Sequence, residues 1–285
     1  MLQAISRPQE EILKAVYRYR YMTALDVTYL LYSPASITHV RENLAYLSGG
    51  KDNAENQYLY RFPLPQFSGG QSDRIYTLGT KGRSLLSELG LQVDWYFKPI
   101  KVRHLSFSHL IHALTLTRFL VALNYFVKTH PSYKILQEKP SYELERKETK
   151  KAKTVIPDAW VLVEGKKQKT PLFLEIDRGT EYKQAFKKRL KARLDYVQGG
   201  AYEHDFGMEA VTIIYATTGQ LPEYQTSRRI AMCIWTMELL QELNMEEWAS
   251  VFHFAGLDWN KLYAIPLFDS QMWYRPDKNK PHVLL

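Results

Sequence analysis

Apolar and polar residues repeat with a helical period over the first part of the chain. Residues 8–20 place apolar side chains on one helical face after a proline in the first turn, which predicts a helix. Two further helices are expected, over 23–32 with Thr23 as the N-cap and over 33–50, where two glycines end the helix.

A different period follows these helices. Residues 57–64 and 73–78 are rich in strand-forming residues and flank a turn-rich segment, so they predict a hairpin. A helix over 80–90 closes the region. Three helices, a hairpin and a closing helix together predict a winged helix-turn-helix domain over residues 1–92.

The remainder of the chain predicts a second domain over residues 104–285, after a linker at 93–103. Residues 105–130 are apolar on most sides, which indicates a buried helix. Three strands, a basic helix, a strand and a helix are expected after it, at 133–144, 154–165, 171–179, 181–198, 209–219 and 226–243. This order is typical of an α+β or α/β fold with a mixed central sheet flanked by helices.

Composition limits the classes of protein to which the chain belongs. Its 285 residues are 45% hydrophobic and 24% charged, as in a folded domain rather than a disordered chain. Cys233 is the only cysteine, which excludes an intrachain disulfide and a cysteine-built zinc site. We expect a cytoplasmic protein with no membrane partner, because we find neither a signal peptide nor an apolar run of roughly 18 residues.

The net charge of +8 is concentrated in the middle of the chain. Residues 1–100 carry 11 Lys and Arg against 9 Asp and Glu, residues 101–200 carry 21 against 10, and residues 201–285 carry 6 against 11. Such a basic region is typical of proteins that bind phosphates, and double-stranded DNA is the expected partner. Solvated lysine-rich loops are the alternative explanation.

The third predicted helix is the candidate for reading DNA. In a winged helix it enters the major groove, while basic residues on or beside the hairpin contact the backbone. The candidate groove residues are Thr38, His39, Arg41 and Asn43, and the candidate backbone contacts are Arg61, Arg74 and Lys81. Winged helices also serve as protein–protein adaptors, so both interpretations remain open.

Acidic residues end two of the predicted strands of the second domain. Strand alternation places Asp158 on one face of its strand, and Glu175 and Asp177 on one face of the next. If these strands are antiparallel neighbours, Asp158 and Glu175 lie side by side. Paired carboxylates suit Mg²⁺ or Mn²⁺, and such an ion activates water and stabilises charge on a phosphorus atom.

Each acid also has a structural interpretation. Asp177 precedes Arg178 and Gly179, so it is a candidate turn residue, with Thr180 as the cap of the next helix. Glu175 lies within an apolar run, where a carboxylate is costly to bury unless it is paired or binds a metal.

These motifs resemble those of a known family. The strand order with "PD" on one strand and a late Glu on the next is similar to that of the PD-(D/E)xK nucleases. More narrowly, "PDAWVLV", "FLEIDRGTE" and the basic helix, behind "RIYTLGTKGRSLL", resemble the plasmid replication-relaxation family over nearly the whole chain. The resemblance implies that Asp158 and Glu175 are metal ligands and that Glu138 is a candidate third acid.

The chain departs from the nuclease pattern at its lysine. Asp177 stands two residues after Glu175, where the motif has Lys. In some relatives this lysine moves to the following helix, and the resemblance places it close to Lys188 or Arg189. Helical phase puts Lys183, Lys187 and Lys191 in one row and Arg189 and Arg193 in another. An arginine at the site would stabilise negative charge but would not transfer protons.

Three functions are therefore expected, in decreasing order. The first is a divalent-metal-dependent DNA endonuclease or nickase of a plasmid or mobile element, with Asp158 and Glu175 as ligands and Lys188 as the phosphate partner. Asp177 and Glu138 are its secondary acids, and Lys187 and Lys191 are further contacts to nucleic acid. The expected partners besides DNA are a second copy of the chain or other mobile-element proteins.

The second function is that of a DNA-binding accessory or regulatory factor whose nuclease-like fold is a scaffold. The third is a protein adaptor that uses the aromatic residues near the C-terminus. These aromatic residues are Trp248, Phe252, Trp259 and Trp273.

Overall fold

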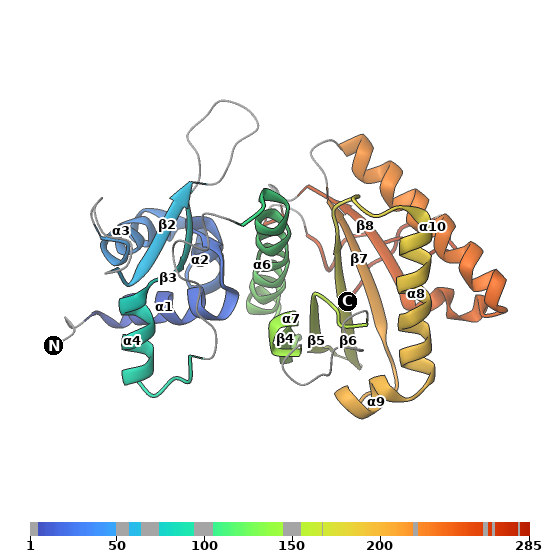
Figure 1. Ribbon diagram of the computed structural model, residues 1–285, viewed down its shortest axis with the longest axis horizontal. Coiled ribbons are helices and arrows are strands. Elements are labelled where there is room, and N and C mark those ends of the chain that lie inside the picture. The colour runs from blue at the N-terminus through green and yellow to red at the C-terminus, as the bar shows by residue number, and fades with distance from the viewer. Residues whose placement is uncertain are drawn as a thin grey trace. The chain divides into compact units, whose positions relative to one another are not determined.

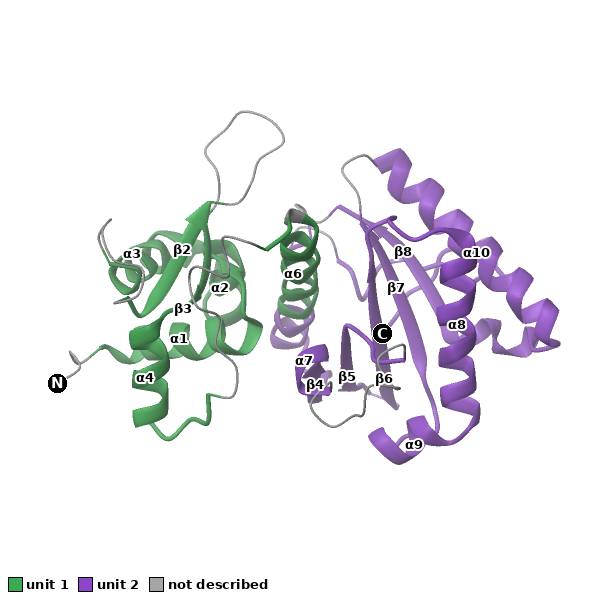
Figure 2. Cartoon of the chain, viewed as in Figure 1, with its two compact units in different colours: residues 1–122 green, residues 123–285 purple. Residues whose placement is uncertain are grey.

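The computed structural model shows an α+β protein that divides into two compact units, residues 1–122 and 123–285 (Figures 1 and 2). It describes residues 5–49, 57–63, 74–93, 105–144, 155–166, 168–218, 222–258, 262–263, 266–278 and 280–285. The boundary lies inside helix α6, Phe107–Thr129, which the sequence predicts to belong wholly to the second domain. The predicted linker, apart from Val93, lies outside the described residues.

Unit 1 contains helices and a small antiparallel sheet with the strand order β1-β3-β2. Its helices are α1 (Arg7–Tyr19), α2 (Ala24–Leu31), α3 (Ile37–Leu47) and α4 (Thr80–Glu88). A 3₁₀ turn, Pro34–Ser36, precedes α3. The strands are β1 (Met22–Thr23), β2 (Leu59–Pro63) and β3 (Arg74–Leu78). The sequence pattern does not predict β1, because two residues are too few to show a period.

Thr23 both caps α2 and fixes the start of the helix in the core. Its hydroxyl accepts from the Asp26 amide at 3.3 Å, and the Asp26 carboxylate accepts from the Thr23 amide at 2.6 Å. This is the predicted N-cap, in capping-box form. Asp26 is buried and faces Arg118 of α6 at 3.4 Å, so the cap is also tied to the helix that ends unit 1.

Unit 2 is built on a five-stranded mixed sheet with the order β4-β5-β6-β7-β8, which confirms the predicted mixed sheet. The strands are β4 (Lys134–Pro140), β5 (Ala159–Glu164), β6 (Lys169–Asp177), β7 (Thr212–Thr218) and β8 (Phe252–Leu257). The first three are antiparallel, and β6, β7 and β8 are parallel. The helices are α7 (Ser141–Leu144), α8 (Lys183–Gln198), α9 (Ala201–Phe206) and α10 (Pro222–Leu243), and a 3₁₀ helix, Glu246–Val251, precedes β8.

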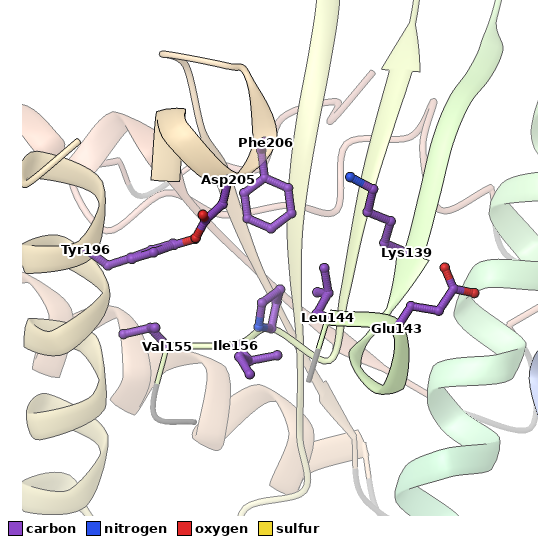
Figure 3. A pocket seen from close by; sticks show the side chains of 9 residues that line it. Lys139, Glu143, Leu144, Val155, Ile156, Tyr196, Asp205 and Phe206 are labelled. Atoms are coloured by element: carbon purple, nitrogen blue, oxygen red, sulfur yellow. The ribbon is translucent and has the colours of Figure 1, made fainter. Parts of the chain in front are cut away.

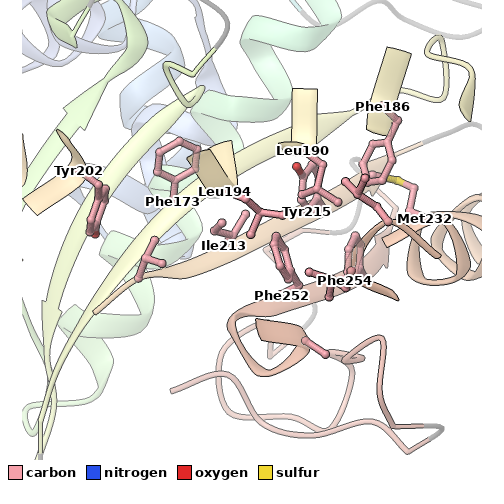
Figure 4. Close-up of a cluster of buried hydrophobic side chains, with 14 of the residues drawn as sticks. Phe173, Phe186, Leu190, Leu194, Tyr202, Ile213, Tyr215, Met232, Phe252 and Phe254 are labelled. Carbon is pink, nitrogen blue, oxygen red and sulfur yellow. The ribbon is translucent and has the colours of Figure 1, made fainter. Parts of the chain in front are cut away.

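Helices α8, α9 and α10 cover one face of this sheet and form the main core of unit 2 (Figure 4). On α8, Phe186, Leu190 and Leu194 repeat every four residues, so they form one buried row over the strands. The ring of Tyr215 on β7 stacks on Phe254 of β8 with centroids 5.2 Å apart. Burial of this aromatic layer fixes α8 to the sheet.

The aromatic residues near the C-terminus belong mainly to the core. Phe252 and Trp273 are fully buried, and Trp248 packs against the core from a partly buried position. Trp259 lies outside the described residues. The described part of this aromatic set is therefore used for folding, which disfavours the adaptor function predicted from it.

Helix α6 differs from the sequence expectation in one respect. Its segment Ser108–Thr129 is long and apolar enough to cross a membrane by length and composition, whereas the sequence analysis found no such run. Within the described residues it is the one segment that passes this test, and 67% of its apolar 18-residue window is buried in the fold. The core helix of a soluble protein passes the same test.

Two histidines join β8 to the C-terminal segment. His253 Nδ1 and His282 Nε2 are 2.6 Å apart, next to a backbone bridge between Trp273 and His282. Burial, followed by the neighbouring His282, lowers the pKa of His253 to about 3. Such a pair is compatible with one shared proton, because two imidazolium rings would repel at this distance.

This histidine pair predicts a loss of stability in mild acid. Below pH 6.5 the unfolded chain binds a proton at His253 that the folded chain does not bind until about pH 3. The free energy of unfolding should therefore fall by about 2 kcal/mol between pH 6.5 and pH 5. Urea titrations across this range measure the slope.

The matched variants are His253→Phe and His204→Gln. His253→Phe should flatten the pH dependence, whereas His204→Gln should preserve it, since the His204 side chain is 87% exposed. Equal slopes in the wild type and His253→Phe would contradict the assignment.

Candidate functional site

The strand register brings Asp158 and Glu175 together. Strands β5 and β6 are antiparallel with Ala159 opposite Leu174, so the preceding residue, Asp158, lies opposite Glu175. The Asp158 amide donates to the Leu174 carbonyl at 3.0 Å, and its Oδ2 accepts from the Ile176 amide at 2.8 Å. The predicted adjacency of the two acids is thus confirmed.

Arg193 of α8 reaches Glu175 from the helix above the sheet. The two side chains form an ion pair, and the residues are 2% and 5% exposed. Arg193 Nη1 also donates to the Tyr215 hydroxyl at 2.5 Å. Tyr215 is the register neighbour of Glu175 on β7, so a carboxylate and a phenol on adjacent strands hold one buried cation.

The electrostatics of this cluster favour a charged arginine. Burial lowers the pKa of Arg193, but Glu175, Tyr215 and Asp158 together outweigh burial, and the net effect raises that pKa. Burial raises the pKa of Tyr215 to about 12, although Arg193 opposes the change. Arg193 therefore stays charged and Tyr215 stays neutral under physiological conditions.

This arrangement does not fit a divalent metal ion. Glu175 already faces the Arg193 guanidinium, and one Asp158 oxygen accepts from a backbone amide. An ion between the two acids would lie beside a buried positive charge, which raises its energy at low dielectric. Among the described residues, no group of three or more His, Cys, Asp and Glu side chains is placed to hold a metal.

Asp177 has a structural role at the end of β6. Its carboxylate accepts two hydrogen bonds from Arg228 of α10, at 2.7 and 3.0 Å. Its Oδ2 also accepts from the amide of Gly179, whose φ of +71° favours glycine. The interpretation of Asp177 as a turn residue agrees with these contacts. Thr180 does not cap the next helix, because α8 begins after Tyr182.

Glu138 lies on the other face of the sheet. Glu138 is opposite Val161 in the register, so the two side chains share one face of the sheet. Residues 158 and 161 are three positions apart and therefore point to opposite faces, so Glu138 and Asp158 lie on opposite faces. The Glu138 carboxylate accepts from Asn124 Nδ2 of α6 at 2.8 Å. The structure therefore does not bring Glu138 to the acidic pair, contrary to the role expected for it.

The lysine row of α8 forms ion pairs away from the acids. Lys187, which the sequence analysis assigned to nucleic acid, has a side chain only 12% exposed. The partners are Glu238 for Lys183 and Lys187, Glu242 for Lys187, and Asp195 for Lys191, at 2.6 to 3.0 Å. Most of this row therefore attaches α8 to α10.

The basic residue of α8 that contacts Glu175 is Arg193. Neither Lys188 nor Arg189, the two predicted candidates, lies there. Lys188 is exposed, and Arg189 pairs with Glu181. The sequence contained a usable signal, because Arg193 lies between the buried positions Leu190 and Leu194 of the apolar row. The nuclease motif has lysine at this place, so the motif favours Lys188 over Arg193.

The candidate DNA-binding residues of unit 1 are unevenly exposed. Thr38, His39 and Arg41 are exposed on α3. Asn43 is buried, and its Nδ2 donates to the His39 carbonyl at 2.9 Å, so the prediction that it is presented to DNA is wrong.

The basic candidates near the hairpin lie on or beside its strands. Arg74 on β3 and Lys81 on α4 are exposed, and Arg61 on β2 is half-buried. Arg61 is opposite Tyr76, and Arg74 is two residues away from Tyr76 on the same strand. Arg61 and Arg74 therefore share one face of the sheet.

The buried ion pair predicts a strong asymmetry between single and double substitutions. Arg193→Met should lower the free energy of unfolding by about 3–5 kcal/mol, because it leaves Glu175 buried without its cation. Glu175→Gln/Arg193→Met should recover much of that loss, since no charge stays uncompensated. Urea unfolding of each variant gives the coupling energy.

Lys188→Met is the control for loss of one positive charge from α8. Because Lys188 is exposed, the free energy of unfolding of the Lys188→Met variant should stay within about 0.5 kcal/mol of the wild-type value. Strictly additive effects of the Glu175 and Arg193 substitutions would rule out the coupling.

The comparisons with known proteins agree with the resemblance found in the motifs. A family model described as replication-relaxation matches residues 13–212, which include most of unit 1 as well as Asp158 and Glu175. No curated protein and no solved structure gave a match. Membership indicates a role in the replication or relaxation of a plasmid or other mobile element. The chain belongs to the replication-relaxation family.

Proposed function

We propose that this chain is a DNA-binding accessory factor of plasmid or mobile-element replication, and that unit 2 is a nuclease-like scaffold without cleavage chemistry. The observation that carries the proposal is the buried Arg193 guanidinium against Glu175. The Arg193 guanidinium is fixed beside Asp158 and Glu175, where a nuclease would hold its metal ion. Arginine also cannot transfer protons in place of the lysine of the nuclease motif.

The element order of unit 1 supports DNA binding. Helix, strand, two helices and two strands follow one another, and the first strand pairs with the last. This is the order of a winged helix, in which the helix before the hairpin is the recognition helix. That helix is α3, and it exposes Thr38, His39 and Arg41 together with the Tyr46 ring, which is 48% exposed.

Phosphate contacts would supply most of the affinity. Arg41, Arg74 and Lys81 have exposed positions in unit 1 and carry charge that can release counterions from DNA. Thr38 and His39 provide hydrogen-bonding groups for base edges in the major groove.

A metal-dependent endonuclease is the second candidate, and one observation favours it. Asp158 and Glu175 are directly opposite each other on antiparallel strands, as a two-carboxylate site requires. The element order α6, β4, β5, β6, α8 and β7 is also that of the PD-(D/E)xK nucleases. For this function Arg193 would have to leave Glu175.

The DNA-binding role predicts a specific change in salt dependence. Arg41→Ala should weaken binding to plasmid-origin duplexes and reduce the slope of log K against log salt by about one, because one phosphate contact is lost. Fluorescence anisotropy from 50 to 300 mM salt measures both quantities.

Lys278→Ala removes one exposed positive charge from unit 2 and is the control. It should leave the slope unchanged if α3 makes the contact. A slope that does not change in Arg41→Ala would remove α3 from the interface.

The accessory role makes a second prediction, about metal ions and cleavage. Mn²⁺ is titrated into the wild type and into Asp158→Ala/Glu175→Ala in a calorimeter. The two proteins should give the same result, because we expect no Mn²⁺ site at these acids. The same double variant, once shown to be folded by circular dichroism, should bind duplex DNA as the wild type does.

The supercoiled-plasmid nicking assay decides between the two candidates. The wild type should leave the plasmid intact with Mg²⁺ or Mn²⁺. Nicking that requires the metal and disappears in Asp158→Ala would establish the endonuclease instead.

A further inference from the structure

Two hollows of unit 2 differ in what they present to a ligand. The smaller, of about 160 Å³, lies between α9 and the segment before β5 (Figure 3). Its Glu143 carboxylate points away from Phe206 and Tyr196, and its Asp205 carboxylate accepts from the Tyr196 hydroxyl at 2.6 Å. The two acids therefore do not converge on one ligand. The larger hollow, of about 580 Å³, is an open groove between α10 and residues 274–278.

An apolar stripe of α10 forms the floor of this groove. Ile230, Ile234 and Met237 follow one another at spacings of four and three residues, so they lie on one side of the helix, and Cys233 adjoins them. Burial raises the pKa of the Cys233 thiol to about 12, so the thiol stays protonated and adds to the apolar surface. Ile230 and Ile234 are 45% and 52% exposed, although the opposite side of α10 packs in the core. Adjoining exposed aliphatic side chains of this kind are typical of a surface that binds a protein.

Contacts between the two walls fix the shape of the groove. The guanidinium carbon of Arg229 on α10 lies 3.5 Å from the ring centroid of Tyr274. Tyr274 is paired with Phe254 of β8 through two backbone hydrogen bonds of 2.8 Å. The Lys278 amide donates to the Arg275 carbonyl at 3.2 Å and closes the turn. The groove is therefore formed before a partner binds, which lowers the entropic cost of binding.

The rim of the groove is basic, in a part of the chain that is acidic as a whole. Residues 201–285 carry 6 Lys and Arg against 11 Asp and Glu, yet three of the six basic residues line this groove. Arg275 and the acid of the lining, Glu238, are each in an ion pair with another residue of the chain. Arg229 and Lys278 have no acidic partner among the described residues. A ligand that carries carboxylates beside its apolar groups therefore complements the groove.

The same features disfavour two other kinds of occupant. Nucleic acid carries negative charge, but its bases stack on aromatic faces, whereas this floor is aliphatic and Tyr274 already has Arg229 over one face. In a symmetric dimer, a second copy of the chain would bring the same basic rim to the interface, so like charges would meet.

We propose that the groove binds an acidic amphipathic helix of a partner protein. Apolar residues of that helix at i, i+3 or i+4, and i+7 would pack on the α10 stripe, and its carboxylates would lie beside Arg229 and Lys278. The inference goes beyond DNA binding and does not depend on it, because the groove belongs to unit 2 and α3 to unit 1.

Three synthetic peptides test the proposal by fluorescence anisotropy with the full chain. The first, the Glu peptide, carries fluorescein, Leu at i, i+3, i+4 and i+7, and Glu and Gln at its other positions. The second, the Lys peptide, has Lys in place of each Glu. The third has the composition of the Glu peptide in an order without helical spacing. We expect the Glu peptide to bind about tenfold more tightly than either of the others.

Matched variants locate the binding site on the chain. Ile234→Gln should weaken binding of the Glu peptide about tenfold through loss of one apolar contact, whereas Leu89→Gln, at a 47% exposed leucine of unit 1, should not change it. Lys278→Glu should weaken binding of the Glu peptide and strengthen that of the Lys peptide, whereas Lys188→Glu on α8 should change neither. Each of these side chains is exposed, so the variants should keep the wild-type circular dichroism spectrum.

Equal binding of the Glu and Lys peptides, or binding that Ile234→Gln leaves unchanged, overturns the proposal. Sedimentation velocity tests for a second copy in the groove, and we expect the wild type and Ile234→Gln to sediment alike. A wild-type dimer that Ile234→Gln converts to a monomer would assign the groove to a second copy and overturn the partner helix. Arg41→Ala should keep the affinity for the Glu peptide, so failure of the DNA-binding function and failure of this docking site are distinguishable.

Discussion

The ion pair between Arg193 and Glu175 is the constraint on which unit 2 depends. Both side chains are removed from water, so each would be costly to bury without the other. Tyr215 adds a hydrogen bond, and the apolar row of α8 holds the guanidinium over the sheet. The register of β5, β6 and β7 and the rotation of α8 must all be correct before this contact forms. The pair therefore specifies the arrangement of the sheet and its covering helix, even where it adds little net stability.

The same contact explains why a nuclease-like arrangement and an accessory role are compatible. Two carboxylates on opposed strands remain where a metal site would need them, but an internal cation now neutralises the buried one. Asp177, where the nuclease motif has lysine, is likewise used for structure through Arg228. Acids that would serve chemistry in a nuclease here fix strand ends and helices. In the proposed accessory role, the recognition of DNA would fall to other surfaces, with α3 as the principal candidate.

Much of this fold was predictable because its signals are local. Periodicity located the helices and strands, the Thr23 cap was correct, and alternation placed Asp158 beside Glu175 once the strands were assumed to be neighbours. Most failures came from contacts between distant segments. Nothing local shows that Glu138 faces Asn124 or that Lys187 is bound by α10. Asn43 is different, because its partner His39 lies four residues earlier on the same helix. The role of Arg193 had a partial local signal in its place beside Leu190 and Leu194 of the apolar row, but its partner Glu175 lies on a strand 18 residues earlier, and the spacing alone does not show that contact.

Strand β6 has a consequence for the order in which unit 2 assembles. On one side it pairs with β5, which is close in sequence, and on the other with β7, which follows only after α8 and α9. In the antiparallel meander of β4, β5 and β6, β5 and β6 are joined by a short loop and β4 and β5 by residues 141–158, whereas the parallel pairs of β7 and β8 require longer crossovers. We therefore expect the meander to form early and to present β6 as an unpaired edge until β7 docks. During synthesis that edge is a template for pairing with other chains, and the delay before β7 emerges sets how long the nascent protein is exposed to aggregation.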